Sequence, residues 1–204
     1  IDRAGIVGAD GETHHGIFDI SYLRHIPNMT IMAPKDGDEL EAMLEYSLQL
    51  DGPCAIRYPR GSVETIGKTN KIRIGKSHQL KRGTDVEIWS VGTMAKIVLE
   101  AADILKSNGI SASVINAEFI KPLDKEKLEK SASKYPLIVT VEDNMVSGGF
   151  GESVKEYLKG NDLQIINFGW PDSFIEHGTA DELYKKHGMD AKSIAERIIK
   201  ELER

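Results

Sequence analysis

The sequence is short of cysteine, of long apolar runs and of basic clusters. Its single cysteine, Cys54, excludes an internal disulfide framework and a cysteine-rich zinc site. No apolar run approaches the roughly 18 residues that a membrane-spanning helix needs, and no signal-peptide pattern opens the chain. The formal charge of -6, without a dense basic run, argues against nucleic acid as a partner. These absences indicate a globular protein of the reducing cytoplasm, with neither membrane nor nucleic acid among its partners.

What the sequence does contain is ordinary for a globular protein. Its 204 residues are 40% hydrophobic and 28% charged, enough for one large or two small cores. It starts without methionine, and Ile1 reads as the last residue of an apolar strand. We therefore expect an internal or C-terminal fragment of a longer protein, with a processed mature chain as the alternative.

A first alternating block runs from residue 29 to residue 58. Strands are expected at 29–33 and 54–58, and the helix expected at 36–50 begins with a capping-box-like pair, Asp36 and Glu39. Such a βαβ unit has parallel strands joined by a right-handed crossover. The helix is expected to bury one apolar face, made of Leu40, Met43, Leu44 and Leu48.

The composition changes at residues 63–83, where large apolar side chains are few and lysines and glycines are frequent. This indicates an exposed connector, with one short strand near residues 72–74. Alternation then resumes, and the last two expected helices begin at Thr179 and at Asp190. Four strands alternating with helices predict a separate three-layer α/β domain over 84–204. The expected strands are 86–91, 112–116, 137–141 and 163–168.

The opening segment, residues 2–16 (DRAGIVGADGETHHG), combines four glycines with charged and imidazole side chains. Arg3 directly follows one expected strand and Arg60 follows another, and ligands bind outside the carboxyl ends of parallel strands. Two guanidinium groups at one rim suit a phosphate or a carboxylate. His14 can move a proton near neutral pH, and Asp10 can accept a hydroxyl proton or orient the imidazole. A glycine-rich loop with surface charges is the alternative.

Two further segments resemble binding motifs more weakly. The turn at 147–153 (SGGFGES) is similar to a phosphate cradle at a helix N-terminus, but Val154 stands where a dinucleotide fingerprint needs its third glycine. Close packing of this turn is therefore favoured over a ligand. The VEDN segment at 141–144 places two carboxylates at a strand end, where capping or solvated charge is favoured over a metal site.

The remaining histidine signals do not predict a metal site. His14 and His15 are adjacent and point apart in an extended segment, and no third ligand is spaced to help them. His177 precedes a helix N-terminus, where most histidines are structural or lie at an interface. We expect no metal ligand in this chain.

Five stretches carry a resemblance to a known family: DRAGIVGADGETHHGIFDISYLR, YPRG, FIKPLD, VEDN with GGFG, and PDSFIEHGT. Together they resemble the C-terminal portion of the 1-deoxy-D-xylulose-5-phosphate synthases, thiamine-diphosphate enzymes of the transketolase-like superfamily. The resemblance implies a partial parallel-sheet pyrimidine-binding domain at 1–62, a connector at 63–83 and a three-layer α/β transketolase C-terminal-like domain at 84–204.

The resemblance also implies the activity of the full-length enzyme. That enzyme decarboxylates pyruvate and adds the remaining two-carbon unit to D-glyceraldehyde 3-phosphate, releasing CO₂, in the synthesis of isoprenoid, thiamine and pyridoxal precursors. It is a cytoplasmic homodimer that depends on thiamine diphosphate and Mg²⁺, and the cofactor performs the carbanion chemistry.

Carried over position by position, the family's functional residues fall on the residues singled out above. Arg3 and Arg60 match the arginines that hold the acceptor's phosphate. His14 matches the histidine that lies over the reacting carbons, and Asp10 matches the aspartate implicated in acceptor recognition. The family's metal and diphosphate segment, and its glutamate that activates the aminopyrimidine, are missing from this sequence. The chain alone is therefore expected to be inactive and to bind neither thiamine diphosphate nor Mg²⁺.

Two alternatives stay open at this point. The chain can belong to another thiamine-dependent enzyme, such as a transketolase or a 2-oxoacid dehydrogenase β-subunit. It can also be a non-catalytic α/β subunit that serves dimerisation or binds a regulatory ligand, for which the turn at 147–153 is the supporting feature.

Overall fold

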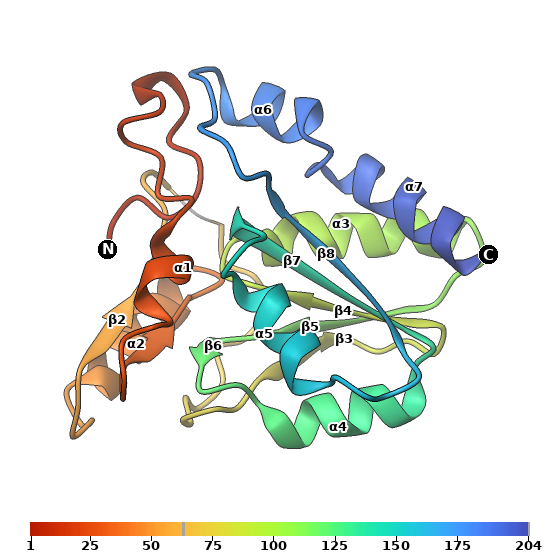
Figure 1. Ribbon diagram of the computed structural model, residues 1–204, viewed down its shortest axis with the longest axis horizontal. Helices are drawn as coiled ribbons and strands as arrows, with labels where there is room; N and C mark the ends of the chain where they lie inside the picture. The colour runs from red at the N-terminus through yellow and green to blue at the C-terminus, as the bar shows by residue number, and fades with distance from the viewer. Residues whose placement is uncertain (63, 204) are drawn as a thin grey trace.

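The computed structural model describes residues 1–62 and 64–203. Its strands form a three-stranded sheet, in the order β2-β1-β6, and a five-stranded sheet, in the order β3-β5-β4-β7-β8. Figure 1 shows the small sheet with α2 standing beside the larger unit, whose sheet carries helices on both faces. This mixed α/β architecture confirms the predicted fold class.

The small sheet is built on the predicted βαβ unit. Strands β1 (Thr30–Met32) and β2 (Cys54–Ile56) pair in parallel, and helix α2 (Gly37–Ser47) connects them. The Asp36 carboxylate caps α2 by accepting the backbone N–H of Glu39 at 2.9 Å. All three elements were predicted, and each is shorter at its ends than expected.

The predicted apolar face of α2 is partly wrong. Met43 is buried, but the side chains of Leu44 and Leu48 are 57% and 83% exposed. The residue that shares the buried face with Met43 is Glu39, one helical turn earlier. Its carboxylate accepts hydrogen bonds from the Asn116 amide at 2.9 and 3.0 Å. This long-range polar contact sets the rotation of α2 about its axis, so that Glu39 faces the interior and Leu44 and Leu48 face solvent.

A strand from far along the chain completes the small sheet. Strand β6 (Phe119–Lys121) pairs antiparallel to β1, with Ile31 opposite Lys121. This strand was not predicted from the sequence. Residues 84–204 therefore supply part of the sheet of residues 1–62, and the two predicted domains share it. The boundary expected at 62–63 falls on Val63, which lies outside the described residues.

The large sheet contains the four predicted strands, which run parallel. A fifth strand, β3 (His78–Lys81), joins one edge antiparallel to β5 and was not predicted. The strand expected near residues 72–74 is wrong. There, Ile72 is buried against Met32 and Phe119 as a single side chain, without strand pairing. The predicted strands are β4 (Val86–Ser90), β5 (Ala112–Asn116), β7 (Leu137–Met145) and β8 (Gln164–Trp170).

Helices cover both faces of the large sheet (Figure 1). Helices α3 (Met94–Ser107), α6 (Ala180–Lys186) and α7 (Ala191–Leu202) pack on one face. Helices α4 (Lys125–Lys134) and α5 (Phe150–Tyr157) pack on the other. Thr179 and Glu182 form the predicted capping box of α6, and Asp190 caps α7. None of the helices in the described part of the chain is long and apolar enough to cross a membrane.

The opening segment folds against both units. A 3₁₀ turn, η1 (Gly8–Asp10), lies in the glycine-rich loop, and a short helix, α1 (Asp19–Leu23), follows it. Asn144, at the carboxyl end of β7, accepts the backbone N–H of Ile20 at 3.0 Å and so holds the start of α1. The loop therefore stands where the carboxyl ends of strands from both sheets can support it.

Candidate anion-binding site

The first residues of the chain run beside the end of β2. The N-terminal amine of Ile1 donates to the Ile56 carbonyl at 2.9 Å, and the Tyr58 N–H donates to the Ile1 carbonyl at 3.0 Å. The Ala4 N–H then donates to the Tyr58 carbonyl at 3.0 Å, in the pattern of parallel strands with one extra residue. Arg3 and Arg60 thus follow neighbouring segments that point the same way.

The structure brings two of the four predicted site residues into contact. Arg60 forms an ion pair with Asp10, and the side chains are 58% and 34% exposed. Exposed ion pairs of this kind contribute little to stability, because water screens them and holding two long side chains costs entropy. The guanidinium therefore remains accessible to an anion from solvent.

The other two predicted residues stand apart from this pair. Arg3 is exposed and makes no side-chain hydrogen bond or ion pair with another described residue. His14 is also exposed, and its Nδ1 lies 2.9 Å from the Thr13 hydroxyl. No hydrogen bond or ion pair between described residues joins either side chain to Arg60.

A cavity of about 390 Å³ opens next to Arg60, lined also by Asp2, Pro34, Tyr58 and Thr93. A volume of this size suits a small ligand such as a phosphate ester. Of the four predicted residues, only Arg60 lines it. The cavity lies where β2 ends, at the kind of sheet edge where open α/β proteins bind ligands.

The two adjacent histidines have different environments. His15 is buried, its Nδ1 accepts the Val7 N–H at 3.0 Å, and its Nε2 lies 3.2 Å from the Glu176 carbonyl. Because Nδ1 accepts, Nε2 carries the proton and donates to that carbonyl. His15 thus joins the opening loop to the segment before α6, whereas His14 is left free at the surface.

The side chains at this site suit an anion better than a divalent cation. Two guanidinium groups, an imidazole and a carboxylate that is already paired offer few oxygen ligands for Mg²⁺. Within residues 1–62 and 64–203, no group of three or more histidine, cysteine or acidic side chains could hold a metal ion. The residues present do not fit the Mg²⁺ of the implied cofactor.

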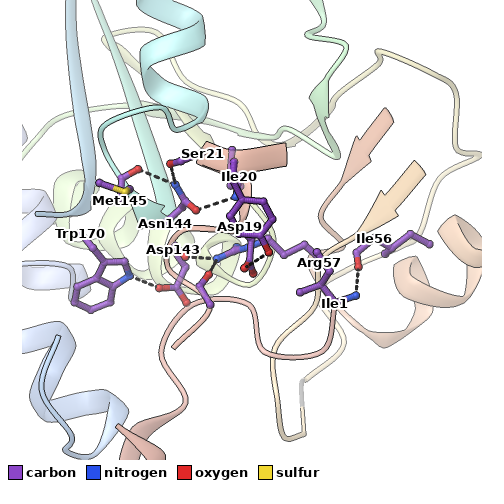
Figure 2. A network of polar contacts seen from close by, with 12 residues as sticks. Ile1, Asp19, Ile20, Ser21, Ile56, Arg57, Asp143, Asn144, Met145 and Trp170 are labelled. Atoms are coloured by element: carbon purple, nitrogen blue, oxygen red, sulfur yellow. Dashed lines mark hydrogen bonds and ion pairs between the residues drawn. The ribbon is translucent and has the colours of Figure 1, made fainter. Parts of the chain in front are cut away.

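A buried ion pair beneath the loop, which Figure 2 shows, was not predicted from the sequence. The Nε of Arg57 lies 3.3 Å from an Asp19 carboxylate oxygen, and both side chains are nearly inaccessible. The same guanidinium donates to the carbonyls of Gly16 and Asp143. A signal was present, since Arg57 is the only charged residue in its strand segment, and a buried charge requires partners.

The VEDN segment and the glycine turn form one internal contact. Glu142 is buried and accepts the backbone N–H groups of Phe150 and Gly151 at 2.7 and 2.8 Å, at the start of α5. Burial raises the pKa of Glu142 to about 8. A side chain at Gly149 would place its Cβ 2.4 Å from this carboxylate. The capping role and the close packing of the turn are confirmed, and the solvated-charge alternative is wrong.

His177 lies against the opening loop. Its Cβ is 3.2 Å from the position that a Cβ would take at Gly11, so the loop passes closely over it. The Gly178 N–H donates to the Gly8 carbonyl at 3.4 Å in the same contact. The prediction of a structural or interface role for His177 agrees with this contact between segments.

Comparison with known families identifies the two halves of the chain. The model of the transketolase C-terminal domain matches residues 75–194, and that of the transketolase pyrimidine-binding domain matches residues 1–65. The chain belongs to the transketolase family. Both matches agree with the resemblance that the sequence motifs indicate.

Individual relatives indicate which enzymes of this family the chain is similar to. The chain is 46% identical over 203 residues to a 1-deoxy-D-xylulose-5-phosphate synthase of Caldanaerobacter subterraneus, covering 98% of this chain and 33% of the relative. It is 46% identical over 207 residues to the synthase of Heliobacterium modesticaldum, covering 99% of this chain and 32% of the relative. The chain thus spans about a third of these relatives, and they favour a synthase fragment over the alternatives.

Solved structures agree on the fold. A split-gene transketolase, described as an inactive β4 tetramer, superposes with a TM-score of 0.89 at 31% identity, covering 96% of this chain and 65% of that one. The transketolase of Campylobacter jejuni superposes with a TM-score of 0.75 at 20% identity, covering 98% of this chain and 30% of that one. The latter likeness concerns the fold alone.

Proposed function

We propose that this chain is the acceptor-binding and C-terminal part of a 1-deoxy-D-xylulose-5-phosphate synthase. The complete enzyme condenses pyruvate with D-glyceraldehyde 3-phosphate, releases CO₂ and supplies a precursor of isoprenoids, thiamine and pyridoxal. One observation carries the proposal for this chain: Arg60 lines a cavity beside the end of β2 and keeps an accessible guanidinium. The synthase relatives over nearly the whole chain support the same reaction.

In this proposal each site residue acts on the acceptor. Arg60 and Arg3 hold the phosphate, because the guanidinium fork matches its oxygens. The exposed imidazole of His14 moves a proton at the acceptor's carbonyl oxygen. Asp10, which is paired with Arg60 in the free protein, hydrogen-bonds an acceptor hydroxyl once the phosphate has taken over the guanidinium.

The cofactor site lies outside this chain in the proposal. Thiamine diphosphate and Mg²⁺ are held by other parts of the complete enzyme, which works as a homodimer in the cytoplasm. The chain alone is then inactive. The split-gene transketolase supports such an arrangement, since that protein is described as an inactive β4 tetramer and its chain has the same fold.

A regulatory ligand at the glycine turn has no support in the geometry. The backbone N–H groups at the start of α5 that would receive a phosphate already bind the Glu142 carboxylate. No space is left for a second anion there, because Gly149 packs directly against that carboxylate. The second candidate function is therefore not adopted.

The test replaces the matching third of the Caldanaerobacter synthase with this chain and measures formation of deoxyxylulose 5-phosphate. Arg60→Ala should raise the KM for glyceraldehyde 3-phosphate about 10- to 100-fold, because losing a charge-assisted hydrogen bond costs roughly 1.5–3 kcal/mol. Pyruvate decarboxylation should stay nearly unchanged. Arg82→Ala, at an exposed arginine next to β3, is the matched control. Unchanged acceptor kinetics in Arg60→Ala would contradict the assignment.

A further inference from the structure

The loop that carries Asp10 and His14 closes at a narrow neck. The Gly5 N–H donates to the Gly16 carbonyl at 3.2 Å, and the Gly16 N–H donates back to the Gly5 carbonyl at 2.8 Å. These two residues bring both ends of the loop, residues 6–15, to one place. Whatever fixes the neck also fixes the direction in which the loop leaves the protein.

The neck is pressed against a buried carboxylate of the large sheet. A Cβ at Gly5 would lie 1.6 Å from Oδ2 of Asp143, and the backbone there has a φ of +72°, which glycine adopts easily. A Cβ at Gly16 would lie 2.0 Å from the Arg3 carbonyl oxygen. Neither position has room for a side chain, so the backbone of the neck contacts its supports directly.

Asp143 is itself held in one orientation by the large unit. Its Oδ1 accepts the indole N–H of Trp170 at 2.5 Å, and its Oδ2 accepts the Tyr184 hydroxyl at 2.9 Å. The two aromatic rings stack with centroids 5.6 Å apart. Burial, followed by the Asp143 charge, raises the pKa of Tyr184, which keeps its hydroxyl a donor. The carboxylate therefore cannot turn without breaking two hydrogen bonds, one buried and one partly buried.

Arg57 connects the carboxylate's own backbone to the other side of the neck. Its guanidinium donates to the Asp143 carbonyl and, at 2.7 Å, to the Gly16 carbonyl (Figure 2). Its charge is balanced by Asp19, three residues after Gly16. The neck is thus held on two sides: Arg57, which follows β2 of the small sheet, binds the Gly16 carbonyl, and Asp143 of β7 in the large sheet packs against Gly5.

We propose that Asp143 is a positioning residue which, together with Arg57, fixes the neck of loop 6–15 and thereby sets where Asp10 and His14 stand relative to Arg60. Asp143 acts through the loop and does not touch a ligand. The consequence for acceptor binding rests on the proposed function, whereas the control of the loop by Asp143 does not.

The experiment measures hydrogen exchange of the chain's backbone amides by NMR. Asp143→Asn removes the negative charge that Trp170 and Tyr184 both face and turns an amide N–H toward the Tyr184 hydroxyl. The bond with Tyr184 must then reverse, and neither bond is any longer charge-assisted, so both are weaker. The neck and loop amides should then exchange at least tenfold faster relative to those of the large sheet. These reporters are the amides of Gly5, Val7, His14, His15 and Gly16, all of which donate hydrogen bonds in the structure.

A matched control exists in the same sheet. Glu87 is also buried and accepts an indole N–H, from Trp89 at 3.0 Å, and a hydroxyl, from Ser113 at 3.1 Å. Glu87→Gln should lower global stability and leave the loop's exchange at the wild-type ratio. An equal loosening of the loop in both variants would show that Asp143 merely stabilises the fold, and would overturn the proposal.

A milder variant keeps the proposal testable if Asp143→Asn does not fold. Tyr184→Phe removes one hydrogen bond to Asp143, and the same amides should exchange about threefold faster; unchanged exchange would overturn the proposal.

A separate experiment tests the proposed function: the wild-type chain is titrated with inorganic phosphate, and the NMR shift of the Arg60 side chain is followed. If the loop loosens and wild-type chain shows no phosphate shift, the positioning role stands and the anion site fails.

Discussion

The opening loop and the glycine turn at 147–153 are two glycine-rich segments that the sequence presents as rival anion sites. In the structure they differ in what occupies their hydrogen-bond donors. The turn's backbone N–H groups are occupied by the protein's own Glu142, whereas Arg60, beside the opening loop, pairs with an exposed loop carboxylate, Asp10, and water screens this pair. Glycine content therefore indicates a tight backbone in both, and accessible positive charge separates the proposed anion site from the internal contact.

Removing the internal hydrogen-bond acceptor, Glu142, should break this comparison most strongly. Glu142→Ala leaves the buried N–H groups of Phe150 and Gly151 without a partner, and each unsatisfied group costs about 1–3 kcal/mol. We expect a loss of at least about 2 kcal/mol in the free energy of unfolding, measured by urea denaturation.

The control for this change is Glu152→Ala. Glu152 accepts the Gly148 N–H at 2.7 Å in the same turn but is exposed, so water can replace it. Its loss should cost well under half as much.

Added phosphate sharpens the comparison further, because it should restore stability to Glu142→Ala if the turn can cradle an external anion. Equal effects of the two variants would contradict the internal role of Glu142.

The dependence of stability on pH gives a second, smaller effect. Burial raises the pKa of Glu142 to about 8 and that of Glu39 to about 7, above their value of 4.5 in the unfolded chain. For each of these carboxyl groups, the folded state binds more protons than the unfolded state at pH values between 4.5 and the raised pKa. The free energy of unfolding therefore falls as pH rises through that range. The hydrogen bond with Glu118 raises the pKa of His78, which acts in the same direction.

Denaturation at several values between about pH 5 and pH 8 measures this slope. Each carboxyl contributes up to about 1.4 kcal/mol per pH unit while its protonation differs between the two states. Glu142→Gln should flatten the upper part of the profile, and Glu152→Gln should leave it as it is. The exposed Glu126 and Glu176, whose pKa values are lowered to about 2, act only below this window. Stability that rises from pH 5 to pH 8 would contradict the assignment.

Local patterns in the sequence were enough to predict most of the fold. The βαβ unit and the four parallel strands each have a clear periodicity and clear ends. Strands β3 and β6 were missed because each is short and is defined by a distant antiparallel partner. The exposed Leu44 and Leu48 were misplaced because Asn116, far along the chain, draws Glu39 into the interior.

The candidate site was predictable to a similar extent. The place of Arg3 and Arg60 after neighbouring parallel segments follows from strand order alone. The ion pair between Arg60 and Asp10 depends on how the loop folds back, which no spacing in the sequence encodes. The roles of Arg57 and of Asp143, one of the two carboxylates of the VEDN segment, were not predicted because they depend on contacts between the two sheets.

The smallest expected effect concerns the ion pair at the opening loop. Asp10→Asn removes the carboxylate that competes with an anion for Arg60, whose side chain is 58% exposed. Because exposed pairs contribute about 0–1 kcal/mol, stability should change little and the affinity for inorganic phosphate should rise about two- to fivefold. Glu12→Gln, an exposed carboxylate in the same loop, makes the same change in net charge and should leave the affinity nearly constant. If both variants raise it equally, the effect is general electrostatics, and the loop loses the distinction that separates it from the glycine turn.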